Sequence, residues 1–538
     1  MNRKYWALLA CLALSGLFFL MGVVFIPLAG VQYDEALFIM AYVSPEGIEY
    51  NAVAGDTKIP LMLMTYLGTL KAAILKPVFD VMGYNHRSLR FPPLAFATLS
   101  VALFFFVLKR LTSTRIAIAV TLLLATDAAY LLTSVYDWGP VALQHLFLGV
   151  VLYSGVRYAE SRSALWLIPA GLATGLALWD KAISIWIFAG GGLALLIVFP
   201  REMWTLAKRP VHVAALVLPL LIGAYPLIHY NIQEPMATIT ANTHNTDMAM
   251  VSKIASFDGA LDGRGLFGYV VRDVPDPEGK TGAFRLDERA TLWLSARLGA
   301  PRRSLQHLLL VGAVLILPLM FWSPWRRPAI FTALALLFSW TAMLLTKGAG
   351  GSLHHTILLS PLPHLLAGLV LAEIVRRFPS RGMKIGFAVF ASAVLTNLFV
   401  LNQYRAQFLA FGPTMVWTDA SRPLVEFLGT QHGRIIFPAD WGIQQQIDFY
   451  GGGILGMTRN SEDTPTRLHE EEPRKFMLWA LSVPNHIYVT HTEPNEAFKG
   501  ARKNLIDFAA AQGLNHHLIA VIRDRHHVPM FEIHEFRK

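Results

Sequence analysis

The sequence has 538 residues, and its composition is unusual for a chain of that length. Hydrophobic residues make up 54% of it and charged residues only 15%, against about 25% in soluble domains. This charge deficit excludes a simple string of soluble domains. The net charge is +10, which in a soluble protein would suggest nucleic acid, so the positions of the basic residues matter. The single cysteine, Cys11, excludes disulfides and cysteine-based metal sites within the chain.

Apolar runs of about twenty residues recur from Trp6 to Gln403, which is typical of a multi-pass membrane protein. The first run, from Tyr5 to Tyr33, is too long for a signal-peptide core, so we interpret it as a retained span. With it, we expect eleven transmembrane helices. The later spans are predicted at 89–108, 116–134, 139–156, 164–180, 183–199, 212–230, 305–322, 329–346, 355–375 and 385–402.

The basic residues lie mainly on one side of these spans. If the N-terminus is cytoplasmic, the inner segments hold sixteen lysines and arginines: Arg3, Lys4, Lys109, Arg110, Arg115, Arg157, Arg162, Arg201, Lys208, Arg209, Arg326, Arg327, Arg376, Arg377, Arg381 and Lys384. The short outer connectors hold only two, Lys181 and Lys347. This asymmetry follows the positive-inside rule and fixes the predicted orientation. It also explains much of the basic balance without a nucleic-acid partner.

Three larger segments then fall on the outer face: 30–88, 231–304 and 403–538. In the first, the apolar stretch 59–82 is interrupted by Lys71, Lys76 and Pro77, and a full span there would invert every later loop. We therefore expect helices lying at the outer membrane interface in this stretch, with Lys58 at their start. Two further interfacial helices are predicted in the second segment, near 246–261 and 286–298.

The tail from 403 to 538 changes in composition and is predicted to form a small soluble α/β domain after a transmembrane domain, 1–402. Strands are expected at 434–440, 486–491, 517–522 and 529–535. Residues 496–512 follow helical spacing, and Gly513 stops them. The histidines of the tail lack metal-ligand spacing, so we predict no metal site there.

Polar residues gather at the outer ends of the predicted spans. An ionisable residue at membrane depth is a functional candidate by default. Carboxylates can act as a general base or bind a divalent cation, and lysines and histidines can hold a phosphate. A site with both suits a lipid-linked phosphate substrate whose tail lies in the membrane. The candidates are Asp34, Glu35, Lys58, Asp137, Asp180, Lys181, Lys347, His354 and His355.

Each candidate also has a purely structural interpretation. Asp34 could cap an interfacial helix, and Asp137 could be a turn residue before a Gly-Pro pair. Lys181 could simply pair with Asp180. The remaining candidates could be solvated side chains at the membrane surface: Lys58, Lys347, His354 and His355. Two deeper residues are weaker candidates and more often hydrogen-bond within a helix bundle: Asp127 and His145.

Short motifs follow one another in a fixed order along residues 1–402. They are Gln32-Tyr33-Asp34-Glu35-Ala36, Lys58-Ile59-Pro60-Leu61, Arg90-Phe91-Pro92, Tyr136-Asp137-Trp138, the Gly-Leu-Ala-x-x-x-Lys element at 175–181, and the segment 355–363. The ordered set, with its sidedness, resembles the GT-C superfamily of glycosyltransferases that use polyprenyl-phosphate sugars. The likeness is greatest to the protein O-mannosyltransferase and aminoarabinose-transferase branch, although Ile59 stands where that branch has a proline.

The resemblance implies a GT-C-like fold and transfer of a sugar from a polyprenyl-phosphate donor, with inversion at the anomeric carbon. Asp34, with Glu35 beside it, would be the catalytic base or orient the acceptor. Asp137 would assist, and Asp34 and Asp137 could also contact a divalent cation, although no cofactor is certain. The residues that would bind the lipid phosphate are Lys58, Lys181, Lys347, His354 and His355.

The sequence thus predicts a hexosyl- or pentosyltransferase in the bacterial cytoplasmic membrane, with its site and its tail outside the cytoplasm. Its partners would be the lipid-linked donor, membrane lipid and an acceptor glycan, lipid or protein. Three alternatives stay open: a transporter or flippase of lipid-linked glycans, a glycan ligase or polymerase, and a non-catalytic scaffold. The gathering of charges near one face favours an enzyme over a transporter, and the ligases and polymerases lack the acidic motif after the first span.

Overall fold

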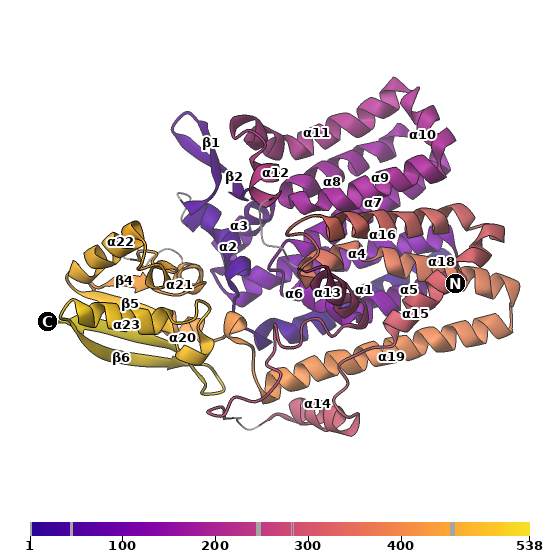
Figure 1. Cartoon of the computed structure of the whole chain (residues 1–538). Helices are drawn as coiled ribbons and strands as arrows, with labels where there is room; N and C mark the ends of the chain where they lie inside the picture. Colours follow the sequence, from indigo (N-terminus) through magenta and orange to yellow (C-terminus); the bar gives the residue numbers. More distant parts are fainter. Residues whose placement is uncertain (1–2, 44–46, 244–248, 281, 283, 452–457) are drawn as a thin grey trace.

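The computed structural model of the chain describes residues 3–43, 47–243, 249–280, 282, 284–451 and 458–538. Most of these residues form a bundle of long helices. A three-stranded sheet and a C-terminal unit, residues 411–538, lie at the same end of the bundle, opposite the N-terminus (Figure 1). One end of the bundle therefore carries nearly all of the non-helical structure.

Each apolar segment expected to span the membrane is helical. Among the described residues, however, six helices are long and apolar enough to cross a membrane, or up to eight if each of two bent pairs is one span. The expected count of eleven is therefore not confirmed. The bundle helices are α1 (Arg3–Phe25), α4 (His86–Leu111), α5 (Thr114–Thr126), α6 (Ala128–Val135), α7 (Val141–Ser161), α8 (Leu167–Asp180), α9 (Ile185–Val198), α10 (Pro200–Ala207), α11 (Pro210–Gln233), α15 (Gln306–Ile316), α16 (Arg326–Leu345), α18 (Leu362–Arg377) and α19 (Arg381–Ala410).

Polar residues and prolines explain the bent pairs. The chain turns by 58° between α5 and α6, where Oδ1 of Asp127 accepts hydrogen bonds from the N–H groups of Ala129 and Tyr130. These contacts begin a new helix at the point where the previous one ends. A bend of 103° separates α9 from α10, which begins at Pro200.

The core of the bundle includes α4, α5 and α18, whereas helices at its periphery expose much of their apolar surface. Phe104 of α4, Val120 of α5 and Leu369 of α18 are almost completely buried in one hydrophobic cluster. By contrast, only 11% of the apolar window of α11 is buried inside the protein. An apolar helix with so small a buried share needs a lipid environment to cover its remaining surface.

The expectation of interfacial helices throughout 59–82 is wrong for the first part of that stretch. The chain forms strands β1 (Tyr50–Ala54), β2 (Thr57–Met64) and β3 (Leu67–Gly68), and only then helix α3 (Leu70–Met82). Strands β1 and β2 pair antiparallel, with Ala54 opposite Thr57. The two residues between them are Gly55 and Asp56, and Gly55 has a φ of +62°. A Gly-Asp pair between two strand-like runs is a hairpin signal.

The hairpin changes the position of Lys58. The residue does not start an interfacial helix, because it lies on β2 with its partner Val53 on β1. It is exposed near the tip of the hairpin, which projects from the end of the bundle (Figure 1).

The second outer segment contains helices α12 (Ala237–Thr243), α13 (Met250–Asp262) and α14 (Leu286–Arg297). The helices expected near 246–261 and 286–298 coincide with α13 and α14, although 246–248 lie outside the described residues. Helix α13 packs against α17 (Leu353–Thr356), which precedes α18. The outer segment therefore covers the part of the chain that carries His354 and His355.

The C-terminal unit begins after α19, which continues past the expected boundary at 402 to Ala410. Its sheet has the order β4-β5-β7-β6, with β4 and β5 parallel and the other pairs antiparallel. Strands occur at the four expected places: β4 (Ile435–Pro438), β5 (His486–His491), β6 (Asn515–Arg523) and β7 (Pro529–Arg537). The helices are α20 (Ser421–Gly429), α21 (Ile443–Gly451), α22 (Glu471–Ser482) and α23 (Ala501–Ala511).

Alternating side chains of the parallel strands face two separate cores. Ile436 and Ile487 pack with α20 and α21, whereas Phe437 and Tyr488 pack with α22 and α23. Both faces of the sheet are thus covered by helices.

Candidate functional site

Asp34 lies in the first turn of α2 (Tyr33–Val43), just after the first span. The side chain of Gln32 accepts a hydrogen bond from the N–H of Asp34 at 2.6 Å and donates one to Oδ2 of Asp34 at 3.4 Å. Burial raises the pKa of Asp34 to about 6. The hydrogen bond from Gln32 and the positive charges of Lys181 and Lys71 lower the pKa and so oppose this rise. The carboxylate is therefore ionised at neutral pH and still basic enough to accept a proton.

Glu35 has a different environment from its neighbour. Its carboxylate is buried and bound by the Arg90 guanidinium through Nε at 2.9 Å and Nη2 at 2.7 Å. The same guanidinium donates to the carbonyl groups of Ile26, Ala29 and Gly30. Glu35, expected as a catalytic residue, thus lies in an ion pair that holds the loop between α1 and α2.

Asp137 lies in the short loop between α6 and α7. Its Oδ1 accepts hydrogen bonds from the N–H groups of Val141 at 2.7 Å and Ala142 at 3.2 Å, at the start of α7. Its Oδ2 lies 2.9 Å from Nζ of Lys71, a buried residue of α3. Lys71 was not among the residues expected at the site, although a lysine within the apolar stretch 59–82 was a visible signal.

Lys181 occupies the break between α8 and α9, where its backbone forms a bridge to Leu67 of β3. Its Nζ is buried and has no hydrogen-bond partner within the described part of the chain. Burial lowers the pKa of Lys181 to about 8, while the carboxylates of Asp137, Asp180 and Asp34 oppose the shift. The side chain therefore carries a positive charge at neutral pH without a bonded partner.

His354 lies next to this ammonium group. Nε1 of Trp138 donates to Nδ1 of His354 at 2.8 Å, so the neutral imidazole carries its proton on Nε2. A Cβ atom built on Gly139 would lie 2.7 Å from Nζ of Lys181 and 3.6 Å from Nε2 of His354. The two N–H donors, Nζ of Lys181 and Nε2 of His354, therefore lie next to the space that a side chain at position 139 would fill. Because residue 139 is a glycine, this space stays open. The ring of His355 packs on His354, with centroids 4.2 Å apart.

Two expected phosphate ligands lie elsewhere. Lys58 is exposed on the hairpin, and Lys347 is exposed in the loop after α16. The structure thus brings Asp34, Asp137, Asp180 and Lys181 together with Lys71 as one charged group, which we call the outer cluster.

Comparisons with known proteins show what the chain and its fold are similar to. Residues 69–229 match the family model described as dolichyl-phosphate-mannose-protein mannosyltransferase. The fold matches the crystal structure of ArnT from Cupriavidus metallidurans bound to undecaprenyl phosphate, with a TM-score of 0.60 and 13% identity over 99% of this chain and 98% of that one. The apo state of ArnT matches with a TM-score of 0.58 and 12% identity, covering 99% and 98% of the chains. No curated protein sequence matches the chain.

The resemblance to the GT-C glycosyltransferases is confirmed. The fold shared with ArnT and the many apolar helices make the chain a multi-pass membrane protein. The matched family segment contains Lys71, Asp137 and Lys181, whereas Asp34 and His354 lie outside it.

A divalent cation was suggested for two carboxylates of the outer cluster, Asp34 and Asp137. Across the described ranges, no group of three or more His, Cys, Asp or Glu residues is placed to hold a metal ion. Both carboxylate oxygens of Asp137 are engaged, one by Lys71 and the other by the N–H groups that begin α7. A cation at Asp137 would therefore have to share its oxygens with these groups, and the divalent cation suggested for Asp34 and Asp137 stays a prediction.

The deeper polar residues contact other helices of the bundle. Oδ2 of Asp127 accepts a hydrogen bond from Gln306 at 2.6 Å and lies 3.4 Å from Nε2 of His364. Nε2 of His145 lies 2.9 Å from the carbonyl oxygen of Ile357. These contacts satisfy groups that would be costly to bury unpaired.

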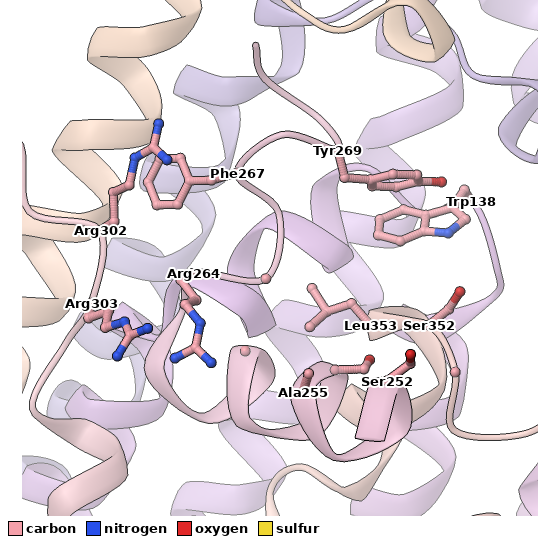
Figure 2. A pocket seen from close by; sticks show the side chains of 14 residues that line it. Trp138, Ser252, Ala255, Arg264, Phe267, Tyr269, Arg302, Arg303, Ser352 and Leu353 are labelled. Atoms are coloured by element: carbon pink, nitrogen blue, oxygen red, sulfur yellow. The ribbon is translucent and has the colours of Figure 1, made fainter. Parts of the chain in front are cut away.

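A cavity of about 620 Å³ lies beside the outer cluster, because it is lined by Trp138, the residue that follows Asp137. Figure 2 shows Trp138 and Tyr269 at one end of it. At the other end lie three arginines: Arg264, Arg302 and Arg303. Their charges are balanced by aspartates, as in the pairs Arg302–Asp273 at 2.8 Å and Arg303–Asp262 at 3.6 Å. The volume falls in the range of ligand pockets, roughly 300–1,000 Å³.

Proposed function

We propose that the chain is an integral membrane glycosyltransferase that transfers a sugar from a polyprenyl-phosphate-linked donor to an acceptor. One observation carries the proposal: the buried ammonium of Lys181 has no hydrogen-bond partner in the described residues and lies beside Nε2 of His354. Burying such a group unpaired is costly, and a phosphate would supply the missing contacts. The fold match to ArnT bound to undecaprenyl phosphate supports the same ligand chemistry.

The reaction needs a base and a stabilised leaving group, and the outer cluster offers both. Asp34 takes the proton of an acceptor hydroxyl, whose oxygen attacks the anomeric carbon of the donor. The bond between that carbon and the phosphate oxygen breaks, and the polyprenyl phosphate leaves with the electron pair. Lys181 and His354 stabilise the added negative charge of the phosphate. The leaving group is already a good anion, so its protonation is not required, and attack from the opposite face inverts the anomeric carbon.

Two other carboxylates support this arrangement. Asp137 fixes the loop that carries Trp138 and Gly139, because its oxygens bind Lys71 and the first turn of α7. Asp180 is held by Nε2 of Gln144 at 3.1 Å. In this mechanism both groups position the phosphate ligands and neither contacts the reacting atoms.

We place the site on the outer face of a bacterial cytoplasmic membrane. The outer cluster lies at the end of the bundle that carries the β-sheet and the C-terminal unit, opposite the N-terminus (Figure 1). The inner connectors hold sixteen basic residues, which the positive-inside rule assigns to the cytoplasm. The cavity beside Trp138 is open to a neutral, hydroxyl-rich ligand such as a glycan, because its arginines are balanced by aspartates.

Variants of the purified protein test the two roles separately. Asp34→Asn should lower sugar transfer at least about a hundredfold, the lower end of the usual contribution of a general base, and still bind undecaprenyl phosphate. Lys181→Met should weaken that binding. The matched controls are Asp80→Asn and Lys76→Met, which remove an ion pair of 2.7 Å on the surface of α3.

Mass spectrometry of lipid-linked sugars and glycans in cells with the gene deleted identifies the substrates. We expect the donor to accumulate and one glycan to lose a sugar. Unchanged transfer by Asp34→Asn would remove the catalytic assignment. Movement of an intact lipid-linked glycan across vesicles, with no sugar transferred, would favour a flippase instead.

A further inference from the structure

The loop that carries Asp34 is held by the C-terminal unit as well as by the bundle. The N–H of Gly30 donates to the carbonyl oxygen of Trp417 at 2.8 Å. The carbonyl oxygen of Val31 accepts a hydrogen bond from Nε2 of Gln446 on α21 at 3.1 Å. These bonds join residues about four hundred positions apart in the sequence, and they end only a few residues before Asp34.

The fit between the loop and the C-terminal unit is close. A Cβ atom on Gly30 would lie 1.8 Å from the carbonyl oxygen of Thr418, so no side chain fits at that position. The guanidinium of Arg525 donates to the carbonyl oxygen of Pro27 at 3.3 Å and pairs with Asp419 at 3.0 Å. The loop therefore lies between Arg90 of the bundle and the C-terminal unit.

The last contact of this interface reaches the residue before Asp34. The rings of Tyr33 and Trp441 are stacked, with centroids 4.6 Å apart and planes inclined by 28°. A Cβ atom on Gly442 would lie only 3.5 Å from Cβ of Tyr33, so the two backbones approach closely. The indole of Trp441 thus covers one face of Tyr33.

Trp441 itself is held rigidly at the end of β4. Oδ1 of Asp440 accepts hydrogen bonds from the N–H groups of Trp441 at 2.8 Å and Phe498 at 2.9 Å. The carboxylate of Glu462 accepts one from the N–H of Gly442 at 3.0 Å. This turn follows the carboxyl end of a parallel strand, the edge at which α/β sheets usually present functional groups.

We propose that Trp441 is a positioning residue for sugar transfer: by stacking on Tyr33 it fixes the carboxylate of Asp34 and excludes water from it. The C-terminal unit is then part of the transferase site and not only an attached domain. The inference rests on the proposed function, because it assigns Trp441 to the reaction that Asp34 would catalyse.

Burial is the main reason that the pKa of Asp34 is raised, and Tyr33, its neighbour in the chain, is close enough to interact with it electrostatically. The titratable groups that face Asp34 come from several elements: Tyr33 of α2, Tyr66 before β3, Lys71 of α3, Lys181 after α8 and Tyr269 of the outer loop. Glu462 of the C-terminal unit also contributes to the raised pKa of Tyr33, whereas Trp441 itself carries no charge. Removing the indole of Trp441 would therefore admit water to Asp34 without removing a charge.

Three variants of the full-length protein test the proposal. Trp441→Ala should lower kcat about tenfold or more, because small displacements of a catalytic group are costly, and leave binding of undecaprenyl phosphate unchanged. It should also move the acid limb of the pH–rate profile to lower pH, since a hydrated Asp34 is more acidic. Trp441→Phe should restore both. The matched control is Trp479→Ala, because Trp479 lies on α22 and is 48% exposed.

The outcomes separate this inference from the proposed function. If Asp34→Asn abolishes transfer but Trp441→Ala keeps the kcat and pH profile of the parent, Trp441 has no positioning role and the proposed function stands. If kcat falls but the acid limb does not move and Trp441→Phe does not rescue it, the contact is merely structural. If Asp34→Asn transfers sugar normally, the proposed function itself fails.

Discussion

The burial of Asp34 has opposite effects on stability and on activity. Its pKa is raised by burial from an ordinary value of 3.8 to about 6, so the folded state binds the proton more tightly than the unfolded state. The tighter proton binding of the folded state adds to the free energy of unfolding. This contribution is fully present below about pH 4 and is lost as the pH rises through about 6. A shift of about two units corresponds to at most about 3 kcal/mol. The ionised form needed for catalysis is thus the less stable one.

Asp34→Asn should therefore stabilise the protein while it abolishes transfer. The gain in melting temperature should be largest at pH 8, shrink between about pH 6 and 4, and vanish below, where Asp34 is protonated in both states. Thermal unfolding of the purified protein at several pH values measures it. Asp80→Asn, at an exposed site, is the control. A gain independent of pH would show that the burial of the charge is not its cause.

Single residues could be assigned to the candidate site from the sequence only where a charged residue stood within or next to an apolar segment. Asp34, Lys181 and His354 were chosen because they lie at the same predicted face, and in the structure they do lie close together. Glu35 was chosen on the same ground, but it pairs with Arg90, which lies 55 positions later. A sequence shows which residues are charged, but it does not show which of these charges form ion pairs in the folded protein.

At the scale of elements, the Lys71–Asp137 ion pair joins α3 to the start of α7. Both side chains are buried, with exposed fractions of 2% and 3%, and the pair is 2.9 Å long. Removing one partner of a buried pair leaves an uncompensated charge, which usually costs about 3–5 kcal/mol. The loop that carries Trp138 and Gly139 would then lose its attachment to α3.

Lys71→Met and Asp137→Asn should each destabilise the protein strongly, and the double variant should cost clearly less than the sum of the two. The reason is that the double variant leaves no unpaired charge. Equilibrium unfolding of the three variants in detergent measures this coupling. The matched cycle on the exposed pair Lys76 and Asp80 should show little or none. Additive effects at Lys71 and Asp137, within about 0.5 kcal/mol, would contradict the pairing.

Helices were easier to predict than strands, for a physical reason. A membrane helix needs about twenty apolar residues, and among the described residues six helices carry this signal, or up to eight if each bent pair is one span. Strands β4 to β7 were also visible, because short apolar runs separated by turns mark them. The hairpin of β1 and β2 was missed, because Pro60 and the apolar residues after it resemble the start of an interfacial helix. The tight turn at Gly55 and Asp56 instead folds the chain back on itself, so that the two strands pair.

At the scale of the whole molecule, the orientation in the membrane links the charges to the function. The proposed site faces outward only if the end of the bundle with the sheet and the C-terminal unit does (Figure 1). The inner ends of the helices carry the basic residues that would hold the opposite end in the cytoplasm. Lipid-linked donors and acceptors differ between the two faces of a membrane, so sidedness decides which substrates the site can reach.

The single native cysteine, Cys11, is buried in α1, so introduced cysteines can report this sidedness against a low background. Asp56, at the hairpin tip, and Thr430, after α20, are exposed and belong to the hairpin and the C-terminal unit, whereas Ser161 is exposed at the end of α7, so each of them can be replaced by cysteine. In intact spheroplasts, a membrane-impermeant maleimide should label the first two. Ser161→Cys should react only after permeabilisation.

The parent protein without an introduced cysteine is the control for labelling of Cys11. Labelling of Ser161→Cys in intact spheroplasts, with Asp56→Cys and Thr430→Cys protected, would show that the protein has the opposite orientation in the membrane. The outer cluster would then face the cytoplasm, and Lys181 and His354 could meet only lipid phosphates on that side. Such a result would leave the fold unchanged and remove the extracytoplasmic acceptor from the proposed function.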